Sequence, residues 1–391
     1  MSDSFSRRVS LELADLTAKK LLRTLDIRES RQGEKIIIDG RKLINFCSND
    51  YLGMASDAKI IKRVTAEVKK YGVGSGSASL LSGRSSLHAE LEDKLARFAG
   101  TESALIFSSG YLANTGAIPS LLRKTDFIFH DRLNHASLID GVLASNAGHK
   151  RYPHGQVPDL SLPILGESEV KMLVTESVFS MDGDLVDLCS LASTALENDS
   201  ILYVDDAHGF GIIGNGRGAA GILGHKHQVP PAVLIMVPFG KALGSMGAAL
   251  LGPQRAIDLL IQKARTYVYD TALPPVCVAA ALQALELLEN GAGKRESLST
   301  NISFFRQQAD KAEIPLQNSA SPIQPIILGG EEKALFVSKY LAQSGFYVRA
   351  IRPPTVPVGT SRIRLTITAG HNKTQILSVI KAIKEAMSMI P

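Results

Sequence analysis

Tryptophan is absent from this chain of 391 residues, and cysteine occurs only three times, at Cys47, Cys189 and Cys277. The three cysteines are odd in number, far apart in the sequence and without C-x-x-C spacing. Neither a disulfide framework nor a thiolate metal site is therefore encoded, and we expect no metal. Free thiols fit a reducing compartment, so the expected location is the cytoplasm.

Long apolar runs and a marked excess of charge of one sign are also missing. The longest nearly apolar run, residues 229–239, is far shorter than the ~20 residues of a membrane-spanning helix, and the N-terminus lacks the apolar segment of a signal peptide. Lysine and arginine number 43 against 38 aspartate and glutamate residues, and the net charge of +5 is spread thinly. These features predict no membrane and no nucleic acid as a partner.

Short apolar runs alternate with longer helical patterns in the middle of the chain. The runs cover residues 103–107, 127–130, 172–175, 201–204, 234–237 and 248–251. Strands of a parallel sheet that is covered on both faces read as continuous apolar runs, and their crossover connections are usually helices. The pattern predicts an α/β fold with a large, mostly parallel sheet and helices on both of its faces.

The two ends of the chain follow other patterns. Leucines at helical spacing predict an amphipathic helix from residue 4 to about residue 26, and a hairpin follows over residues 35–46. After residue 290, three helices and three strands predict a smaller α+β domain. We therefore expect an N-terminal arm (1–46), a large domain (47–290) and a small C-terminal domain (291–391).

The fourth apolar run ends in two carboxylates and an imidazole, Asp205, Asp206 and His208. A carboxylate at a strand end can keep the pyridine nitrogen of pyridoxal phosphate (PLP) protonated. On its own, such a carboxylate also fits a ligand of a metal, of a ribose or of a neighbouring loop. Lys241 follows the next run in a glycine-flanked loop. A lysine with a lowered pKa could form a Schiff base there, although most loop lysines are simply solvated.

Two further turns follow strands and open helices. Ser109, Gly110 and Tyr111 form the first turn, where the N–H groups of a helix N-terminus could bind a phosphate. His135 lies in the second turn, where its imidazole could stack on a flat cofactor. Taken alone, each turn also fits an ordinary helix start or a surface histidine.

The order of these four elements is more informative than any one of them. A phosphate-binding turn, a stacking histidine, a strand-end acid and a glycine-flanked lysine follow one another, each after its own strand. The sequence holds no Gly-x-Ser-x-Gly turn, no His-Glu-x-x-His and no dinucleotide fingerprint after the first strand. No metal site or hydrolytic triad fits the same set of residues.

With these elements the sequence resembles the α-oxoamine synthases, PLP enzymes of fold type I that condense an amino acid with an acyl thioester. The resemblance covers essentially the whole chain, and its segments are NFCSNDYLG (45–53), SSGYLAN (108–114), DRLNHASL (131–138), TESVFSMDG (175–183), VDDAHG (204–209) and FGK (239–241). It implies a seven-stranded sheet in the large domain. Two C-terminal segments, residues 321–325 and 350–357, are similar to the biotin-pathway branch of the family.

The resemblance implies a role for each matching residue. Lys241 would hold the cofactor through a Schiff base, Asp205 would pair with its pyridine nitrogen, and His135 would stack on its ring; these are the implied catalytic residues. The other implied cofactor ligands are Ser109, Gly110 and Tyr111 at the phosphate, Ser180 and His208 near the phenolic oxygen, and Thr271 from the neighbouring subunit. The implied substrate ligands are Arg362, a bidentate clamp for the amino-acid carboxylate, together with Asn49, Arg23 and Ser75.

The biotin-pathway branch implies the decarboxylative condensation of L-alanine with a pimeloyl thioester. In that reaction Lys241 would remove the α-proton of alanine as the general base, and Asp205 would keep the ring nitrogen protonated. The thioester carrier stays open between coenzyme A and acyl carrier protein. The implied sharing of Thr271 between subunits predicts a homodimer.

Several positions depart from the family's pattern around the phosphate. Pro238 stands where a threonine usually contacts the phosphate, and proline offers neither a hydroxyl nor an N–H group. Phe210 and Asp270 replace a usual threonine and a usual serine, and residues 74–79 read Gly-Ser-Gly-Ser-Ala-Ser. These changes concern cofactor affinity and acyl specificity more than the class of reaction.

Two other functions remain open. A sister condensing enzyme, such as 2-amino-3-ketobutyrate ligase or a longer-chain acyl transferase, would differ only in its acyl pocket, and segment 350–357 argues against it. A non-catalytic partner subunit would keep the fold without turnover. The joint presence of five residues argues against that second alternative: Lys241, Asp205, His208, His135 and Arg362.

Overall fold

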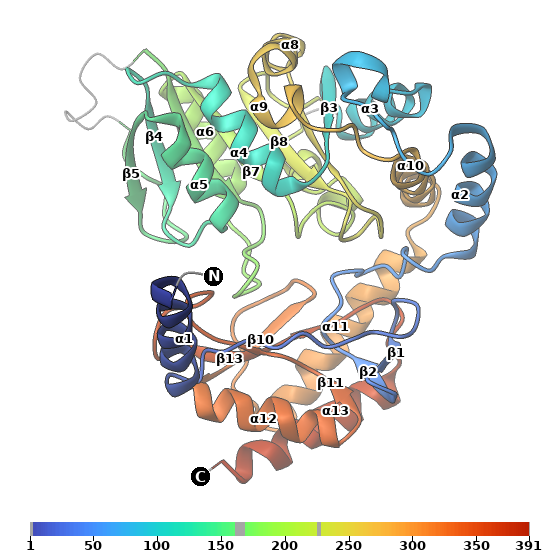
Figure 1. The fold of residues 1–391 in the computed structure, drawn as a ribbon, viewed down its shortest axis with the longest axis vertical. Coiled ribbons are helices and arrows are strands. Elements are labelled where there is room, and N and C mark those ends of the chain that lie inside the picture. Colours follow the sequence, from blue (N-terminus) through green and yellow to red (C-terminus); the bar gives the residue numbers. More distant parts are fainter. Residues whose placement is uncertain (1–2, 161–168, 225–227, 391) are drawn as a thin grey trace. The chain divides into compact units, whose positions relative to one another are not determined.

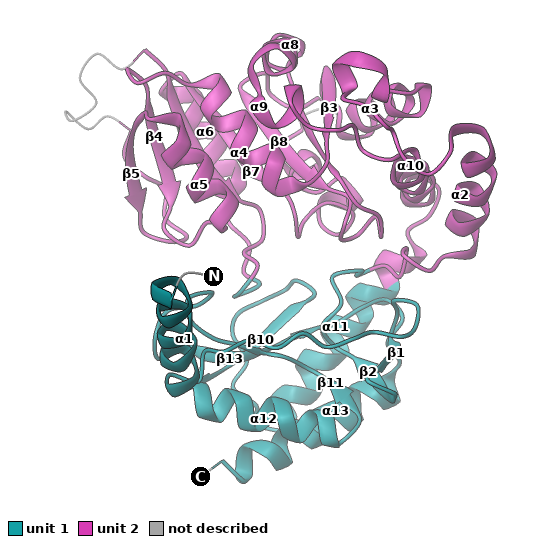
Figure 2. Cartoon of the chain, in the orientation of Figure 1, with its two compact units in different colours: residues 1–51, 181–183, 297–391 teal, residues 52–180, 184–296 magenta. Residues whose placement is uncertain are grey.

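The computed structural model describes residues 3–160, 169–224 and 228–390. The chain forms two compact units (Figure 2). Unit 1 contains Met1–Tyr51, Met181–Gly183 and Ser297–Pro391, and unit 2 contains Leu52–Ser180 and Asp184–Glu296. The N-terminal segment thus groups with the C-terminal segment, and the division into 1–46, 47–290 and 291–391 stays a prediction.

Unit 2 is built on a seven-stranded sheet (Figure 1) with the strand order β3-β9-β8-β7-β6-β4-β5. Its strands are β3 (Ser103–Phe107), β4 (Phe127–Asp131), β5 (Gly148–Tyr152), β6 (Lys171–Glu176), β7 (Ser200–Asp205), β8 (Val233–Pro238) and β9 (Ala248–Gly252). The pairs among β5, β4, β6, β7 and β8 are parallel, and only β9 runs antiparallel to its neighbours β8 and β3. The predicted α/β fold with a mostly parallel sheet of seven strands is confirmed.

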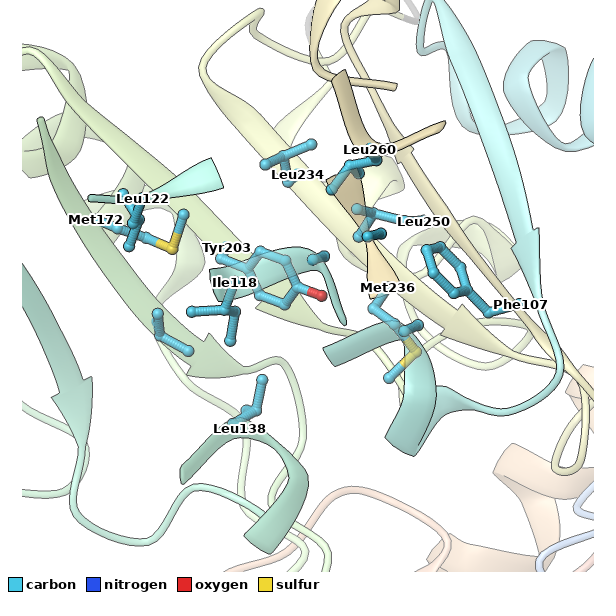
Figure 3. Close-up of a cluster of buried hydrophobic side chains, with 14 of the residues drawn as sticks. Phe107, Ile118, Leu122, Leu138, Met172, Tyr203, Leu234, Met236, Leu250 and Leu260 are labelled. Carbon is cyan, nitrogen blue, oxygen red and sulfur yellow. The ribbon is translucent and has the colours of Figure 1, made fainter. Parts of the chain in front are cut away.

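Unit 2 also contains the helices that pack on this sheet or on one another. They are α2 (Ala58–Tyr71), α3 (Ser86–Ala99), α4 (Gly110–Leu121), α5 (Ala136–Ser145), α6 (Leu188–Glu197), α7 (Ala219–Leu223), α8 (Gln254–Lys263), α9 (Arg265–Val268) and α10 (Pro275–Glu289), with the short turns η1 (Ser79–Gly83) and η3 (Gly214–Gly216). Apolar residues of α4, α5 and α8 pack on one face of the sheet around the buried ring of Tyr203 (Figure 3). Leu202 and Val204 alternate with Tyr203 along β7 and are buried on the other face.

Unit 1 contains two small sheets of three strands each, with the orders β1-β2-β11 and β10-β13-β12. Its elements are α1 (Asp3–Ala18), β1 (Lys35–Ile38), β2 (Arg41–Asn45), β10 (Ile323–Gly329), α12 (Glu331–Gln343), β11 (Phe346–Tyr347), β12 (Ala350–Ile351), β13 (Ser361–Thr366) and α13 (Lys373–Ser388); α11 (Gly293–Lys311) begins just before the unit. The predicted hairpin turns at Asp39 and Gly40, both with positive φ. The predicted N-terminal helix is shorter than expected and ends at Ala18.

The sheet direction decides where the polar side chains gather in unit 2. Because β9 is antiparallel to both β8 and β3, strand β3 runs in the same direction as β4, β6, β7 and β8. The carboxyl ends of these five strands therefore lie at one edge of the sheet, which is the edge where open α/β sheets bind ligands.

Candidate active site

Asp205 is the last residue of β7, and it is only 3% exposed. Asn114 Nδ2 donates a hydrogen bond to one carboxylate oxygen at 2.8 Å, and the backbone N–H of Ala207 donates to the other at 3.0 Å. Both donors are neutral, so they stabilise the carboxylate without cancelling its charge. A negative charge in such a water-poor place is suited to holding a cationic ring nitrogen.

Asn114 connects Asp205 with His135. The amide of Asn114 is fully buried in α4, and its Nδ2 also donates to Ser137 Oγ at 2.9 Å. Ser137 Oγ lies 2.8 Å from His135 Nδ1, and His135 is the N-cap residue of α5. Tyr203 OH donates to Asn114 Oδ1 at 2.9 Å and fixes the orientation of the amide. The imidazole and the carboxylate are therefore held in one hydrogen-bonded network.

Glu176 ends β6 and lies beside Asp205 in the parallel register of β6 and β7. Its Oε1 accepts the backbone N–H of His135 at 2.6 Å. Burial, and the neighbouring charge of Asp205, raise the pKa of Glu176 well above its usual range. The neutral carboxylic acid is favoured as a result, so Glu176 can position the histidine without adding a second full charge beside Asp205.

Lys241 follows β8 in a tight turn. The N–H of Gly244 donates to the carbonyl of Lys241 at 2.9 Å. Gly244 has φ +62°, and a Cβ at this position would lie 2.2 Å from the backbone nitrogen of Ala55, so the turn requires glycine. Partial burial lowers the pKa of His135, the charge of Asp205 opposes this effect, and the charge of Lys241 adds to it. Lys241, His135 and Asp205 are thus brought together electrostatically.

The N-terminus of α4 follows β3 at the same edge. Ser109 is the N-cap residue, and its Oγ accepts the N–H of Leu112 at 3.2 Å. The first N–H groups of a helix have no acceptor within the helix, and the helix dipole adds partial positive charge there. The backbone of Gly110 and Tyr111 therefore offers an anion-binding end, because both residues lie in the first turn.

Two contacts show which parts of this helix end are already engaged with the protein. A Cβ at Gly110 would lie 3.1 Å from Met236 Cε and 3.6 Å from Pro238 Cβ, so Pro238 packs close to the base of the turn. The hydroxyl of Tyr111 donates to Asp140 on α5. The side chain of Tyr111 is therefore engaged with α5, and its backbone is the part suited to a phosphate.

Thr271 and Ser75 lie in two neighbouring loops of unit 2. Ala78 and Thr271 form an isolated antiparallel bridge, and Ser75 Oγ donates to the carbonyl of Leu273 at 2.8 Å. Ser108 Oγ donates to the carbonyl of Thr271 at 3.2 Å, which places that loop beside the α4 end of the same chain. The reach of Thr271 into a neighbouring subunit stays a prediction.

Asp206 differs from its neighbour Asp205. Its carboxyl group is fully buried, Ser177 Oγ donates to Oδ1 at 2.5 Å, and the N–H of Ala219 donates to Oδ2 at 2.8 Å. Burial raises the pKa of Asp206 to about 8. Asp206 thus fastens the loop after β6 to α7. His208 is buried two residues further on, and Ser180 lies partly exposed in the loop after β6.

Arg362 lies on β13 of unit 1 and is buried. Its Nε donates to the carbonyl of Thr360 at 3.0 Å, and its Nη1 donates to the carbonyl of Met181 at 3.2 Å and to Asp182 Oδ1 at 2.6 Å. The predicted carboxylate clamp is therefore paired with a carboxylate of its own chain. The sequence did not predict this pair.

Asn49 and Arg23 also belong to unit 1. Asn49 Oδ1 accepts long hydrogen bonds from Arg364 Nη2 at 3.5 Å and from Tyr51 OH at 3.4 Å. Arg23 is exposed, and its Nη2 lies 3.4 Å from Thr355 Oγ1, in the segment that resembles the biotin-pathway branch. The roles of Asn49 and Arg23 toward substrate stay predictions.

The groups at the sheet edge of unit 2 fit PLP. A phosphate suits the N-terminus of α4, a protonated ring nitrogen suits the buried carboxylate of Asp205, and an aldehyde suits the amine of Lys241. The flat ring suits the imidazole of His135. Asp205 gives the most specific support, because a buried carboxylate that receives hydrogen bonds from the neutral Asn114 amide and the Ala207 N–H is suited to a cationic partner.

The described residues offer neither a metal site nor a membrane-spanning helix. In residues 3–160, 169–224 and 228–390, no group of three or more histidine, cysteine, aspartate or glutamate side chains could hold a metal ion. Within the described part of the chain, no helix is both long and apolar enough to cross a membrane.

Comparisons with known proteins identify the family. A sequence profile described as aminotransferase class I and II matches residues 41–383. An 8-amino-7-oxononanoate synthase from Saccharophagus degradans is 43% identical over 388 residues, which are 98% of this chain and 97% of the relative. The chain belongs to the 8-amino-7-oxononanoate synthase family. A relative of the same name from Methylococcus capsulatus is 43% identical over 378 residues, which are 96% of this chain and 97% of the relative.

Solved structures of the family and of related enzymes share the fold. Serine palmitoyltransferase from S. paucimobilis, with a bound PLP-myriocin aldimine, has a TM-score of 0.91 and 28% identity, with 100% of this chain and 99% of that chain covered. An 8-amino-7-oxononanoate synthase from Francisella tularensis has a TM-score of 0.74 and 32% identity, with 88% of this chain and 98% of that chain covered. The predicted resemblance and the PLP-dependent fold type I are confirmed.

Three residues of the site were not predicted from the sequence. Asn114 and Glu176 lie inside the segments that carry the family resemblance, but no role was assigned to them. Asp182 lies in the segment TESVFSMDG. Glu176 could have been found from its position: it is an acid at the carboxyl end of β6, the strand next to the one that ends at Asp205.

Proposed function

We propose that this chain catalyses the PLP-dependent condensation of L-alanine with a pimeloyl thioester, releasing carbon dioxide and a free thiol and giving 8-amino-7-oxononanoate for biotin biosynthesis. The observation that carries this proposal is the placement of Lys241 and Asp205 after adjacent strands of the sheet, in a chain that is 43% identical to a synthase of this name over 98% of its length.

PLP supplies an electron sink for the carbanion that forms at Cα of the amino acid. Lys241 Nζ would hold the cofactor, and the α4 end would bind its phosphate through the backbone of Gly110 and Tyr111. Asp205 would hold a proton on the ring nitrogen, and the Asn114 network would keep Asp205 and His135 in fixed positions. Ser180 and His208 are proposed to lie near the phenolic oxygen.

Lys241 has a second proposed task. As a free amine, its Nζ would take the α-proton of alanine as the general base. The tight turn after β8 supports this task because the hydrogen bond from Gly244 N–H to the carbonyl of Lys241 holds the backbone from which the lysine side chain extends. Arg362 is proposed to bind the carboxylate of alanine, with Asn49, Arg23 and Ser75 as further substrate contacts.

We also propose a homodimer. Large apolar residues are exposed in the segments before and after the bridge between Ala78 and Thr271: Leu81 is 81% exposed, Tyr269 is 74% exposed and Val73 is 73% exposed. Exposed apolar clusters of this kind mark association surfaces. Sedimentation equilibrium of the holoenzyme should give twice the chain mass of 41.9 kDa, and Leu81→Asp should shift the mass toward the monomer. A monomeric wild-type protein would contradict the proposal.

A cytoplasmic location is proposed as well, supported by three free cysteines.

Product analysis tests the proposed reaction. The purified holoenzyme is incubated with L-alanine and pimeloyl-coenzyme A or pimeloyl-acyl carrier protein, and 8-amino-7-oxononanoate is measured by mass spectrometry. Borohydride treatment should attach the reduced cofactor to Lys241 in the wild type but not in Lys241→Ala. No product from alanine and either pimeloyl thioester would refute the assigned substrates.

The likeness to serine palmitoyltransferase gives a second candidate, a condensing enzyme that uses serine and a long acyl chain. The same assay therefore includes serine, glycine and palmitoyl-coenzyme A. Higher kcat/KM for serine with palmitoyl-coenzyme A than for alanine with a pimeloyl thioester would favour that candidate.

A further inference from the structure

The buried guanidinium of Arg362 has most of its donors in use. An arginine side chain has five N–H groups. The single N–H group of Nε donates to Thr360, and the two N–H groups of Nη1 donate to Met181 and Asp182. Three of the five N–H groups therefore have protein acceptors within the described residues. A bidentate pair with an incoming carboxylate needs two parallel N–H groups on two different nitrogens of the guanidinium, and those of Nε and Nη1 are already in use. One of these three acceptors must therefore leave before Arg362 can bind a carboxylate in this way.

Asp182 is the acceptor best placed to leave. The other two acceptors are backbone carbonyls, whereas Asp182 is a side chain that can rotate. Its side chain is 30% exposed, while that of Arg362 is 4% exposed. The carboxylate can therefore turn toward water at a small cost in solvation, which the guanidinium cannot do.

The backbone next to Asp182 is fixed, so an exchange would involve the side chain alone. Gly183 has φ +73°, and a Cβ there would lie 2.5 Å from both the carbonyl oxygen of Ile323 and Ser319 Oγ. Ser319 Oγ also donates to the carbonyl of Gly183 at 2.8 Å. The loop tip packs too closely against these residues to move as a whole.

Charge balance requires a partner for Arg362 at every stage. A buried cation without a counter-charge is strongly destabilising. In the proposed reaction the carboxylate of alanine arrives as an anion and departs as neutral carbon dioxide, while its bonding electrons stay on the substrate carbon. Arg362 would lose its counter-charge at that moment unless the protein provides another one.

We propose that Asp182 is an exchangeable counterion of Arg362. It yields its place to the carboxylate of the amino acid and pairs with Arg362 again when that carboxylate has left as carbon dioxide. This inference rests on the proposed role of Arg362 in binding alanine. It makes Asp182 a positioning residue that weakens the binding of amino-acid carboxylates and favours their loss.

The test compares Asp182→Asn with the wild-type holoenzyme. Asparagine keeps an oxygen that accepts from Nη1 but removes the competing charge. The KM for alanine and the inhibition constant of propionate, which has the carboxylate of alanine without its amine, should both fall by about three- to tenfold. The KM for the pimeloyl thioester should stay unchanged. Propionate should also raise the melting temperature of Asp182→Asn more than that of the wild type, which needs no turnover.

Asp184→Asn is the matched control. Asp184 lies two residues further along the same loop, but it pairs with His154 rather than with Arg362. Its substitution should leave the propionate constant unchanged. An equal effect of both substitutions would mean that a loosened loop is the cause, and this would overturn the proposal.

Two more outcomes separate this inference from the proposed function. Arg362→Gln should abolish the effect of propionate in both backgrounds. If Arg362→Gln binds alanine and propionate as the wild type does, Arg362 is not the clamp and the proposed function of this residue fails. If Arg362→Gln loses binding while Asp182→Asn binds propionate no more tightly than the wild type, only the exchange is refuted.

Discussion

The buried charges of the two units have different hydrogen-bond partners. In unit 2 the carboxylate of Asp205 receives hydrogen bonds from an amide and a backbone N–H, which leave its charge in place. In unit 1 the guanidinium of Arg362 is matched by the carboxylate of Asp182 at 2.6 Å. Unit 2 thus surrounds its buried anion with neutral hydrogen-bond donors, which suits the cationic ring nitrogen in the proposed function, whereas unit 1 pairs its buried cation with an internal carboxylate.

The residues around Asp205 and around Arg362 differ in the same way as the two charges do. Burying the carboxylate of Asp205 costs stability, and the network of Asn114, Ser137 and Tyr203 offsets part of that cost through hydrogen bonds. Glu176, whose pKa is raised, avoids a second full charge beside Asp205. The Arg362–Asp182 pair needs fewer supporting groups because each partner satisfies the other.

The largest expected effect comes from removing the retained charge. Asp205→Asn keeps the shape of the side chain but cannot hold a proton on the ring nitrogen, so kcat should fall by about 10²–10³-fold at saturating PLP. Asp206→Asn is the control, because Asp206 is equally buried but fastens α7 rather than facing the site. Its kcat should stay within a few-fold of the wild type. A similar loss in both variants would mean that Asp205 acts only through packing.

The second effect concerns the cation of unit 1. Arg362→Lys keeps the positive charge but loses the planar pair of donors, so the KM for alanine should rise by about 10- to 100-fold. Steady-state kinetics with both substrates varied would show whether the KM for the thioester stays constant. Equal increases for both substrates would contradict a role of Arg362 as the carboxylate clamp.

The third effect concerns the phosphate-binding end of unit 2. Pro238 packs near Gly110 and has no hydroxyl, so Pro238→Thr should tighten PLP binding by about tenfold through one added hydrogen bond to a charged group. Fluorescence titration of the cofactor-free protein measures this change. Pro238→Val has the same shape without the hydroxyl and should show no gain. Unchanged affinity in Pro238→Thr would refute the added contact.

The smallest effect is a pair of opposite pH dependences of stability. In unit 1, burial lowers the pKa of His371 to about 4, and its neutral ring accepts from Thr368 N–H and lies 3.0 Å from the carbonyl of Asn45. In unit 2, burial acts to lower the pKa of His154, but the hydrogen bonds and charges of Asp131 and Asp184 outweigh it and raise the pKa to about 10.

The signs follow from which state binds the proton. The stability that neutral His371 contributes is complete above its unfolded pKa of about 6.5 and is lost as the pH falls toward 4. The stability from protonated His154 is complete below about 6.5 and is lost as the pH rises toward 10. Thermal melts from pH 5 to about pH 9 should show a reduced acid-side slope in His371→Gln and a reduced alkaline-side slope in His154→Gln. Between pH 7 and about pH 6 the His371 contribution is on the order of 0.5–1 kcal/mol. Identical slopes in both variants and the wild type would contradict these pKa shifts.

The sheet was predictable because its central strands are buried on both faces. All six apolar runs form strands, and the predicted hairpin at Asp39 and Gly40 is present. Strand β5 was missed because its residues are mostly exposed and show no apolar run. The N-terminal helix was predicted too long, since the leucines beyond Ala18 lie outside the helix and Leu25 is 98% exposed.

The site was predictable only in part. Lys241, Asp205 and His135 could be found because each lies at or shortly after the end of an apolar strand and has a side chain whose chemistry suits a cofactor. Glu176 also ends an apolar strand, but its position alone does not show its role, which depends on Asp205 across the strand pair, and the role of Asp182 depends on Arg362 in a distant segment. Contacts of that kind, such as Asp182 with Arg362, depend on the folded topology and leave no local pattern.

Strand β5 has a consequence for the behaviour of the folded protein in concentrated solution. It is the last strand at one edge of the large sheet, and His149, Lys150 and Arg151 are exposed on it. An unpaired strand edge can pair with the edge of another molecule and start aggregation, and positive charges on the edge oppose this through repulsion. The charged side chains that made β5 difficult to predict therefore also oppose the pairing of this edge with a sheet of another molecule.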